Sequence, residues 1–274
     1  MDNGTATAYL DRIGATAPAA PDAAGLAVLQ ERHLRSVPFE NLSIHLGEPI
    51  VLAEDALVEK VVGRRRGGFC YELNGAFGAL LRHLGYDVSL LAARVHGGGA
   101  LGPPYDHLAL RVDLPEGPWI TDVGFGRFAA RPFRLDVRDD QPDPAGTVRV
   151  VDAGHGDVDA LLAGEPQYRL DLRPRELDEF VATCWYHRTS PDSPFTQAVT
   201  CSLPTPTGRV TVTDRTLITT EDGRRNEREI STGDELLACY RDLFGIVLDR
   251  VPVLSGPRPE VRRPAQAAVA SPGD

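Results

Sequence analysis

Cys70 is the residue of this chain with the clearest chemical potential, because it follows two glycines at the start of an apolar pattern. Apolar residues recur after it at steps of three and four, which predicts an amphipathic helix from about Phe69 to Leu84 that stops at Gly85. A helix start carries unpaired backbone N–H groups and a partial positive charge, and both favour a thiolate over a thiol. The sequence therefore predicts a nucleophilic cysteine in the first turn of a helix.

A thiol nucleophile needs a base and a group that orients the base, and His107 and Asp122 are the candidates. His107 begins a run in which leucine and valine alternate with other residues, the period of a strand with one packed face, so the imidazole is expected to face away from the leucines. Asp122 lies in a second short strand among apolar neighbours, where a carboxylate requires a partner. His96 is the nearest rival base, but the three glycines after it suit a flexible loop. The other histidines lie outside any recognisable site motif: His33, His45, His83, His155 and His187.

Taken singly, each of these residues also has an ordinary structural interpretation. Cys70 could be a buried core cysteine, since free cysteine is among the most buried residue types. His107 could be a hydrogen-bonded core histidine, and Asp122 could cap the turn at Gly124. The choice between these interpretations depends on the other motifs of the chain.

Several separated motifs together resemble the arylamine N-acetyltransferase family, and their order and spacing match from about Tyr9 to Val253. The motifs are Val37–Leu42, Arg66–Cys70 with Glu72 and Asn74, Ala93–Val95, His107 with its leucine strand, and Asp122–Gly126. The resemblance implies a catalytic triad of Cys70, His107 and Asp122 in a cysteine-protease-like arrangement. It also implies ping-pong transfer of acetyl from acetyl-coenzyme A, a cosubstrate and not a resident cofactor, to an arylamine, arylhydrazine or related aromatic amine.

The same resemblance assigns roles to residues around the thiol. Phe39 and Phe125 are expected to form walls for an aromatic ring, and Val95 to lie where the acyl group approaches. Phe195 is expected in the substrate pocket, although Pro194 stands where the family pattern has a histidine, which gives Phe195 a stiffer backbone.

Two further assignments concern the coenzyme and the support of the helix. Gly126 is expected to let the coenzyme arm approach because of its small size. Arg66 is expected to pair with Glu40 and so to brace the helix that carries Cys70.

Two other activities use the same kind of triad. The amide synthases that release or cyclise polyketide thioesters are close relatives of the resembled family, and sequence motifs alone do not separate the two. A thiol hydrolase is the third possibility, but aromatic walls beside the thiol favour an aromatic acceptor over water.

Composition narrows the class of protein. The formal net charge of -10 opposes nonspecific binding to nucleic acid or anionic membranes. No signal peptide and no run of 18 apolar residues is evident, so a cytoplasmic location is expected. The protein is expected to be a monomer or a homodimer. The four cysteines are widely spaced without a C-x-x-C pair, which argues against a metal site and against disulfides.

The pattern along the chain predicts an α+β protein in three parts. Residues 1–87 are mostly helical and are expected to form a bundle that carries the nucleophile. Residues 88–203 contain short alternating runs, expected to form a β-barrel-like domain that carries His107 and Asp122. Ser202–Gly208 resembles a linker, and residues 204–274 are expected to form an α/β lid with a mobile tail from Ser255.

Overall fold

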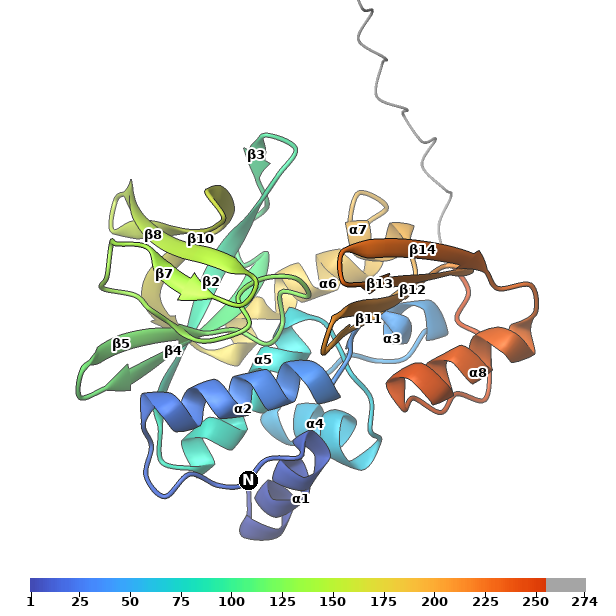
Figure 1. The fold of residues 1–274 in the computed structure, drawn as a ribbon, viewed down its shortest axis with the longest axis horizontal. Coiled ribbons are helices and arrows are strands. Elements are labelled where there is room, and N and C mark those ends of the chain that lie inside the picture. The colour runs from blue at the N-terminus through green and yellow to red at the C-terminus, as the bar shows by residue number, and fades with distance from the viewer. Residues whose placement is uncertain (255–274) are drawn as a thin grey trace, which may run out of the picture.

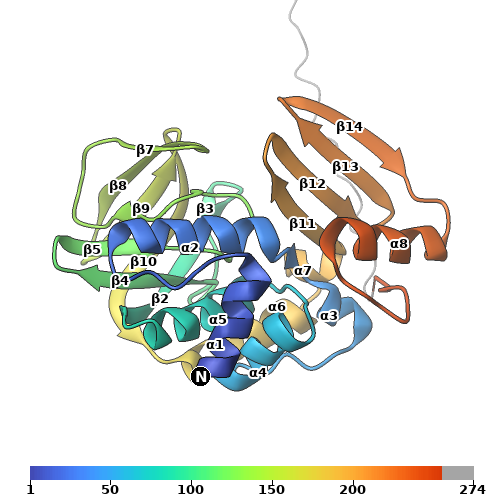
Figure 2. The same cartoon turned by 60° about the horizontal axis from the view of Figure 1, so that its bottom comes forward.

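The structure is a computed structural model that describes residues 1–254, so the predicted tail lies outside the described residues. A helical layer, a barrel-like sheet and a smaller C-terminal sheet follow one another along the chain (Figures 1 and 2). The helical layer lies against both sheets. Its helices are α1 (Asn3–Ile13), α2 (Ala23–Ser36), α3 (Leu42–Leu46), α4 (Glu54–Val58), the π-helical turn Glu59–Gly63 and α5 (Cys70–His83).

Local signals in the sequence account for the ends of these helices. The carboxylates of Asp2 and Asp22 accept backbone N–H groups of the first turns of α1 and α2, each at 2.7 Å. Helix α5 begins one residue after the predicted start and ends one residue before the predicted end. Every residue from Cys70 to Leu81 is buried, which makes α5 the central element of the molecule.

The barrel-like sheet is antiparallel throughout, with the strand order β6-β5-β4-β2-β10-β9-β8-β7, and β3 pairs with β2. Its strands are β2 (Asp87–Gly97), β3 (Ala100–Leu101), β4 (His107–Leu114), β5 (Gly117–Thr121), β6 (Phe133–Arg134), β7 (Gln141–Asp143), β8 (Gly146–Gly154), β9 (Asp157–Leu162) and β10 (Glu165–Arg175). Strand β4 departs from the expectation of one packed face, because both of its faces are buried. Leu108 and Leu110 belong to the core shared with α5, whereas Ala109 belongs to the core inside the barrel.

The C-terminal sheet has the order β1-β11-β12-β13-β14 and packs against α8 (Gly233–Phe244). Its strands are β1 (Phe39–Glu40), β11 (Thr200–Thr205), β12 (Gly208–Thr213), β13 (Thr216–Glu221) and β14 (Arg224–Glu229). The predicted linker at Ser202–Gly208 is wrong, because Leu203 pairs with Val210 in the hairpin of β11 and β12. The prolines of β11 resemble a linker in sequence, yet the strand is well paired. The division after residue 203 therefore cuts through a strand.

A helical segment interrupts the stretch that was expected to be β-rich. The 3-10 turn Leu177–Phe180, α6 (Val181–Thr189) and α7 (Pro194–Gln197) lie between the barrel and β11. Phe180 and Cys184 pack into the core around α5. The site described below takes side chains from this segment.

Candidate active site

The start of α5 holds Cys70 against strand β1, and two glycines make this contact possible. A Cβ atom at Gly67 would collide with the carbonyl oxygen of Pro38. Gly68 accepts a hydrogen bond from the backbone N–H of Glu40 at 2.9 Å. Gly67 must therefore lack a side chain because the strand that carries Phe39 and Glu40 lies directly against it, and a Cβ atom at Gly68 would lie 2.7 Å from the Cβ atom of Glu72.

The fold brings His107 and Asp122 to the same place from two strands. Asp122 is the first residue after β5, and its Oδ2 lies 2.7 Å from Nε2 of His107. The side chains are almost fully buried, since Cys70, His107 and Asp122 are 3%, 2% and 4% exposed. Because Nε2 is engaged by Asp122, Nδ1 is the ring nitrogen left to accept a proton from the thiol.

Hydrogen bonds fix the other oxygen of Asp122. Oδ1 accepts the side-chain amide of Asn74, on α5, and the backbone N–H of Gly124, each at 2.8 Å. Gly124 is also in close contact with α5, since a Cβ atom there would lie 2.7 Å from the Cα atom of Cys70. The turn after β5 and the start of α5 are thereby held in one arrangement.

The electrostatic surroundings of the thiol differ from the sequence-based expectation. Burial raises the pKa of Cys70 well above its ordinary value, and the carboxylates of Asp106 and Asp122 add to the rise. The helix start was expected to lower this pKa, but the effect of burial is larger and in the opposite direction. A thiolate at this position therefore needs the proton to pass to a neighbouring base.

Tyr168, on β10, was not singled out in the sequence although it packs directly on the imidazole. Its ring stacks on His107 with centroids 5.2 Å apart and planes inclined by 29°. Phe125 meets the same imidazole edge to face at 5.2 Å. These two aromatic rings hold the plane of His107, and only the pairing of distant strands shows that Tyr168 is there.

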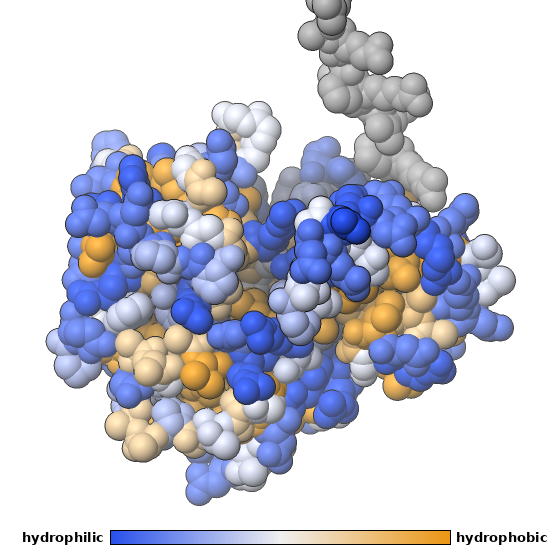
Figure 3. Space-filling view, in the orientation of Figure 1, coloured by the Kyte–Doolittle hydropathy of each residue, from blue (hydrophilic) through white to orange (hydrophobic). Residues whose placement is uncertain are grey.

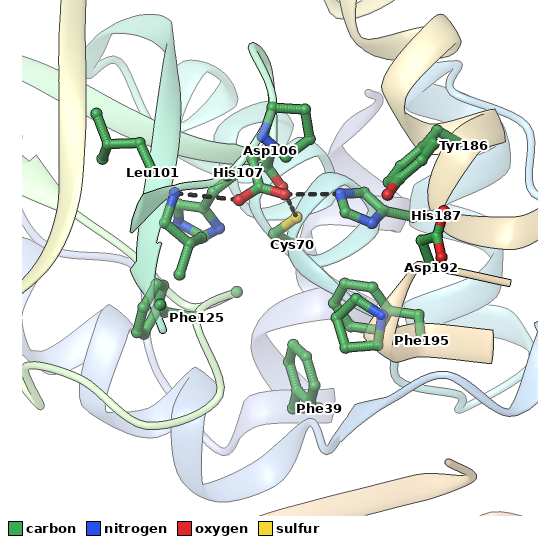
Figure 4. A pocket seen from close by; sticks show the side chains of 16 residues that line it. Phe39, Cys70, Leu101, Asp106, His107, Phe125, Tyr186, His187, Asp192 and Phe195 are labelled. Atoms are coloured by element: carbon green, nitrogen blue, oxygen red, sulfur yellow. Dashed lines mark hydrogen bonds and ion pairs between the residues drawn. The ribbon is translucent and has the colours of Figure 1, made fainter. Parts of the chain in front are cut away.

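A cavity of about 390 Å³ opens beside Cys70. It lies where the barrel, β1 and the segment of α6 and α7 meet, and Figure 4 shows Cys70 between His107 on one side and His187 on the other. The space-filling view in Figure 3 shows that the surface is hollowed between the barrel and the C-terminal sheet. The residues predicted for substrate contact that line the cavity are Phe39, Val95, Phe125 and Phe195.

One predicted site residue lies differently from the rest. Gly126 is not among the residues that line the cavity. It lies behind Phe39, and a Cβ atom added to it would be 3.3 Å from the Phe39 ring. Pro194 is the first residue of α7, and Phe195 donates its backbone N–H to the hydroxyl oxygen of Ser193 at 3.2 Å.

Glu40 and Arg66 lie outside the cavity in a buried network of ion pairs. The guanidinium Nε of Arg66 donates to Oε1 of Glu40 at 3.0 Å, and Lys60 Nζ lies 4.0 Å from the same oxygen. Lys60 also contacts Glu72 of α5 at 2.5 Å. Burial alone would raise the pKa of Glu40, yet the charges of Lys60 and Arg66 hold that pKa below its ordinary value.

A histidine and a carboxylate that the sequence did not point to also line the cavity. His187 lies on α6, outside every recognised motif, and Asp106 directly precedes His107. Nε2 of His187 lies 3.0 Å from Oδ1 of Asp106. Proximity to His107 in the sequence could have indicated Asp106, but no local pattern marks His187.

Comparison with known proteins places these observations in a family. A sequence model described as N-acetyltransferase matches residues 22–253. The chain is 34% identical to the arylamine N-acetyltransferase of Mycolicibacterium smegmatis over 255 residues, which cover 88% of this chain and 91% of that protein.

Solved structures agree with this assignment. The arylamine N-acetyltransferase of Salmonella typhimurium superposes with a TM-score of 0.83 at 29% identity, covering 90% of this chain and 92% of the other. The Mycobacterium marinum arylamine N-acetyltransferase, solved in complex with CoA, gives a TM-score of 0.78 at 32% identity and covers 88% and 92%. The chain is thus an acyltransferase. It belongs to the arylamine N-acetyltransferase family.

Proposed function

We propose that this protein transfers acetyl from acetyl-coenzyme A to an aromatic amine or hydrazine through an acetyl-Cys70 intermediate. The observation that carries the proposal is a buried thiol that lines one cavity with the His107 imidazole, itself held by Asp122 at 2.7 Å. The CoA complex of the Mycobacterium marinum relative supports acetyl-coenzyme A as the donor.

The first half-reaction acetylates the enzyme. Nδ1 of His107 accepts the thiol proton, and Asp122 offsets the charge of the imidazolium that forms. Sγ of Cys70 attacks the thioester carbonyl, a new carbon–sulfur bond forms, and the bond to the coenzyme sulfur breaks. The departing coenzyme thiolate takes the proton back from His107, so that the enzyme is left acetylated and neutral at the base.

The second half-reaction delivers the acetyl group to the acceptor. The amine nitrogen attacks the acetyl carbonyl, and His107 accepts the proton of the amine. The carbon–sulfur bond to Cys70 then breaks, and His107 returns the proton to Sγ so that Cys70 leaves as the thiol. Phe39, Phe125 and Phe195 offer the ring of the acceptor three aromatic faces in the cavity. Val95 lines the cavity, and we propose that the acyl group approaches beside it. The role of Gly126 beside the coenzyme arm remains a prediction, since Gly126 does not line the cavity.

The volume of the cavity favours small acceptors. About 390 Å³ lies toward the lower end of the range for drug-sized ligands, which suits a one- or two-ring amine better than a polyketide chain. The amide synthase alternative is therefore less favoured, and the aromatic lining of the cavity favours an aromatic acceptor over the water that a thiol hydrolase would use. A lid function of the C-terminal sheet with α8, a cytoplasmic location and a monomeric or homodimeric state remain predictions. Within residues 1–254, none of the helices has the length and apolar character needed to cross a bilayer.

Intact-protein mass spectrometry after mixing with acetyl-coenzyme A, without amine, tests the intermediate. We expect the wild-type protein to gain the mass of one acetyl group and the fragment that contains Cys70 to carry it. Cys70→Ala should gain nothing, while Cys184→Ala, which alters another buried cysteine, should still be acetylated. An adduct of full yield in Cys70→Ala would show that the acetyl group sits elsewhere.

A further inference from the structure

A second pair of histidine and carboxylate lies in the cavity, on the side of Cys70 opposite His107 (Figure 4). Nε2 of His187 is 3.0 Å from Oδ1 of Asp106, and His187 is 2% exposed. Neither residue takes part in the mechanism above. Because both residues line the cavity beside Cys70, they are close enough to affect the thiol.

Asp106 is tied to the nucleophile through its backbone. Its carbonyl oxygen accepts the thiol of Cys70 at 3.9 Å and the hydroxyl of Tyr71 at 3.2 Å. Its second carboxylate oxygen, Oδ2, accepts the backbone N–H of Val95 at 3.1 Å. The carboxylate is thus held in a single orientation, next to the thiol and one residue before the base.

The hydrogen bonds of His187 limit where its ring protons can lie. Nδ1 lies 3.2 Å from the hydroxyl oxygen of Ser193, and that hydroxyl lies 3.0 Å from the carbonyl oxygen of His187. If Ser193 gives its one proton to the carbonyl, Nδ1 must carry a proton of its own. Nε2 and Oδ1 of Asp106 are 3.0 Å apart, so one proton must then lie between these two atoms.

Other titratable groups surround His187, but none of those named here is an alternative carboxylate partner for its imidazole. Tyr71 and Tyr186 face the imidazole with ring centroids at 6.2 Å and 5.4 Å, Cys184 lies on the same helix, and Asp192 lines the same cavity. Among residues 1–254, Asp106 is the carboxylate within ion-pair distance of His187.

We propose that the Asp106–His187 ion pair sets the ionisation of Cys70. A carboxylate beside a thiol opposes its loss of a proton, and a cation on that carboxylate cancels the opposition. His187 therefore acts as a positioning residue through Asp106, and it does not touch the reacting atoms. This proposal rests on the proposed function only in taking Cys70 as the nucleophile.

The rate of alkylation of Cys70 by iodoacetamide, followed against pH by mass spectrometry of the Cys70 peptide, tests the pair. Asp106→Asn keeps an oxygen for the N–H of Val95 and removes the charge, so the midpoint should fall by about one pH unit. His187→Gln leaves the carboxylate uncompensated, so the midpoint should rise by a similar amount. Below the midpoint, each shift corresponds to a change of about tenfold in the alkylation rate, in opposite directions.

The double variant and a matched carboxylate complete the experiment. Asp106→Asn with His187→Gln should return the midpoint close to that of the wild type, and Asp192→Asn, in the same cavity, should shift it by less than half as much as Asp106→Asn. Shifts of the two single variants in the same direction, or no shift in Asp106→Asn with an unchanged melting temperature, would overturn the proposal. Iodoacetamide does not require acetyl-coenzyme A, so a failure of acetyl transfer would leave this test unaffected.

Discussion

Asp122 divides its two oxygens between the base and the scaffold. One oxygen accepts from His107, and the other accepts from Asn74 and Gly124. This division means that a change at Asp122 can alter the proton on His107 while the scaffold bonds remain. The effect of a substitution at Asp122 on catalysis can therefore be measured separately from its effect on folding.

Asp122→Asn should retain the fold and lose most activity. Its amide oxygen can keep the bonds to Asn74 and Gly124, but its NH₂ group then faces Nε2 of His107. The imidazole must accept there and carry its proton on Nδ1, where it can no longer act as a base for Cys70. We expect the rate of acetylation by acetyl-coenzyme A to fall by about 10⁴-fold, as judged by rapid-quench mass spectrometry.

The melting temperature of Asp122→Asn serves as the control and should lie close to that of the wild type. Acetylation within tenfold of the wild-type rate, in a folded variant, would move the base away from His107.

The two aromatic walls should have different effects on the two half-reactions. The Phe39 ring lies beside the Phe195 ring, with centroids 6.3 Å apart, whereas the Phe125 ring packs edge to face on the His107 imidazole. Phe39→Leu should lower kcat/KM for an arylamine about three- to tenfold, because an aromatic pair contributes ~0.5–1.5 kcal/mol. Single-turnover acetylation of Cys70 should be nearly unchanged in Phe39→Leu and reduced in Phe125→Leu. Equal effects of the two substitutions on acetylation would refute this division of roles.

At the scale of elements, the active site depends on how the start of α5 is held. Strand β1 lies against Gly67 and Gly68, and the buried pair of Glu40 and Arg66 links β1 to the segment before α5. A buried charge that loses its partner is strongly destabilising. The network around Glu40 is therefore expected to contribute to the stability of the whole helical layer.

Glu40→Gln should reduce the free energy of unfolding by about 3–5 kcal/mol, because Arg66 then loses its fully buried counter-charge, whereas Lys60 keeps its contact with Glu72. Glu48 is the matched control: it contacts the same arginine at 3.1 Å but is partly exposed, so Glu48→Gln should cost about 1 kcal/mol or less. Denaturant titration measures both. Similar losses in the two variants would mean that burial does not strengthen the Glu40 pair.

The loss of stability caused by Glu40→Gln should become smaller as the pH falls. The pKa of Glu40 is lower in the folded protein than its ordinary value, so the ionised carboxylate stabilises the fold at pH values above that ordinary value. This stabilisation is lost as the pH falls through the folded pKa. The difference between wild type and Glu40→Gln should accordingly shrink in acid, and a difference that grows would contradict the sign of the shift.

For the whole molecule, the sequence predicted the elements whose signals are local. The apolar period after Cys70 predicted α5 to within one residue at each end, and alternation after His107 predicted β4. Ser202–Gly208 was misread because prolines and a glycine indicate a loop, whereas the pairing of β11 with β1 and β12 is a nonlocal property. His187 and Tyr168 entered the site for the same reason, since only the packing of α6 and β10 brings them to Cys70.

The cavity is thus a product of the assembled molecule. Cys70 comes from α5, His107 from β4, Phe39 from β1 and Phe195 from α7, so no single segment contains the site. An acceptor enters a space that exists only when the helical layer, the barrel and the segment of α6 and α7 are packed together.

The most direct test of the central claim is a chase of the isolated acetyl-enzyme. The protein is acetylated, freed of acetyl-coenzyme A by gel filtration, and mixed with an arylamine or with buffer alone. We predict that the arylamine removes the acetyl mass from Cys70 and forms one equivalent of acetylated amine, much faster than water removes it. Acetylated amine that forms only when acetyl-coenzyme A and the amine are present together, with no product from the isolated acetyl-enzyme, would contradict transfer through Cys70.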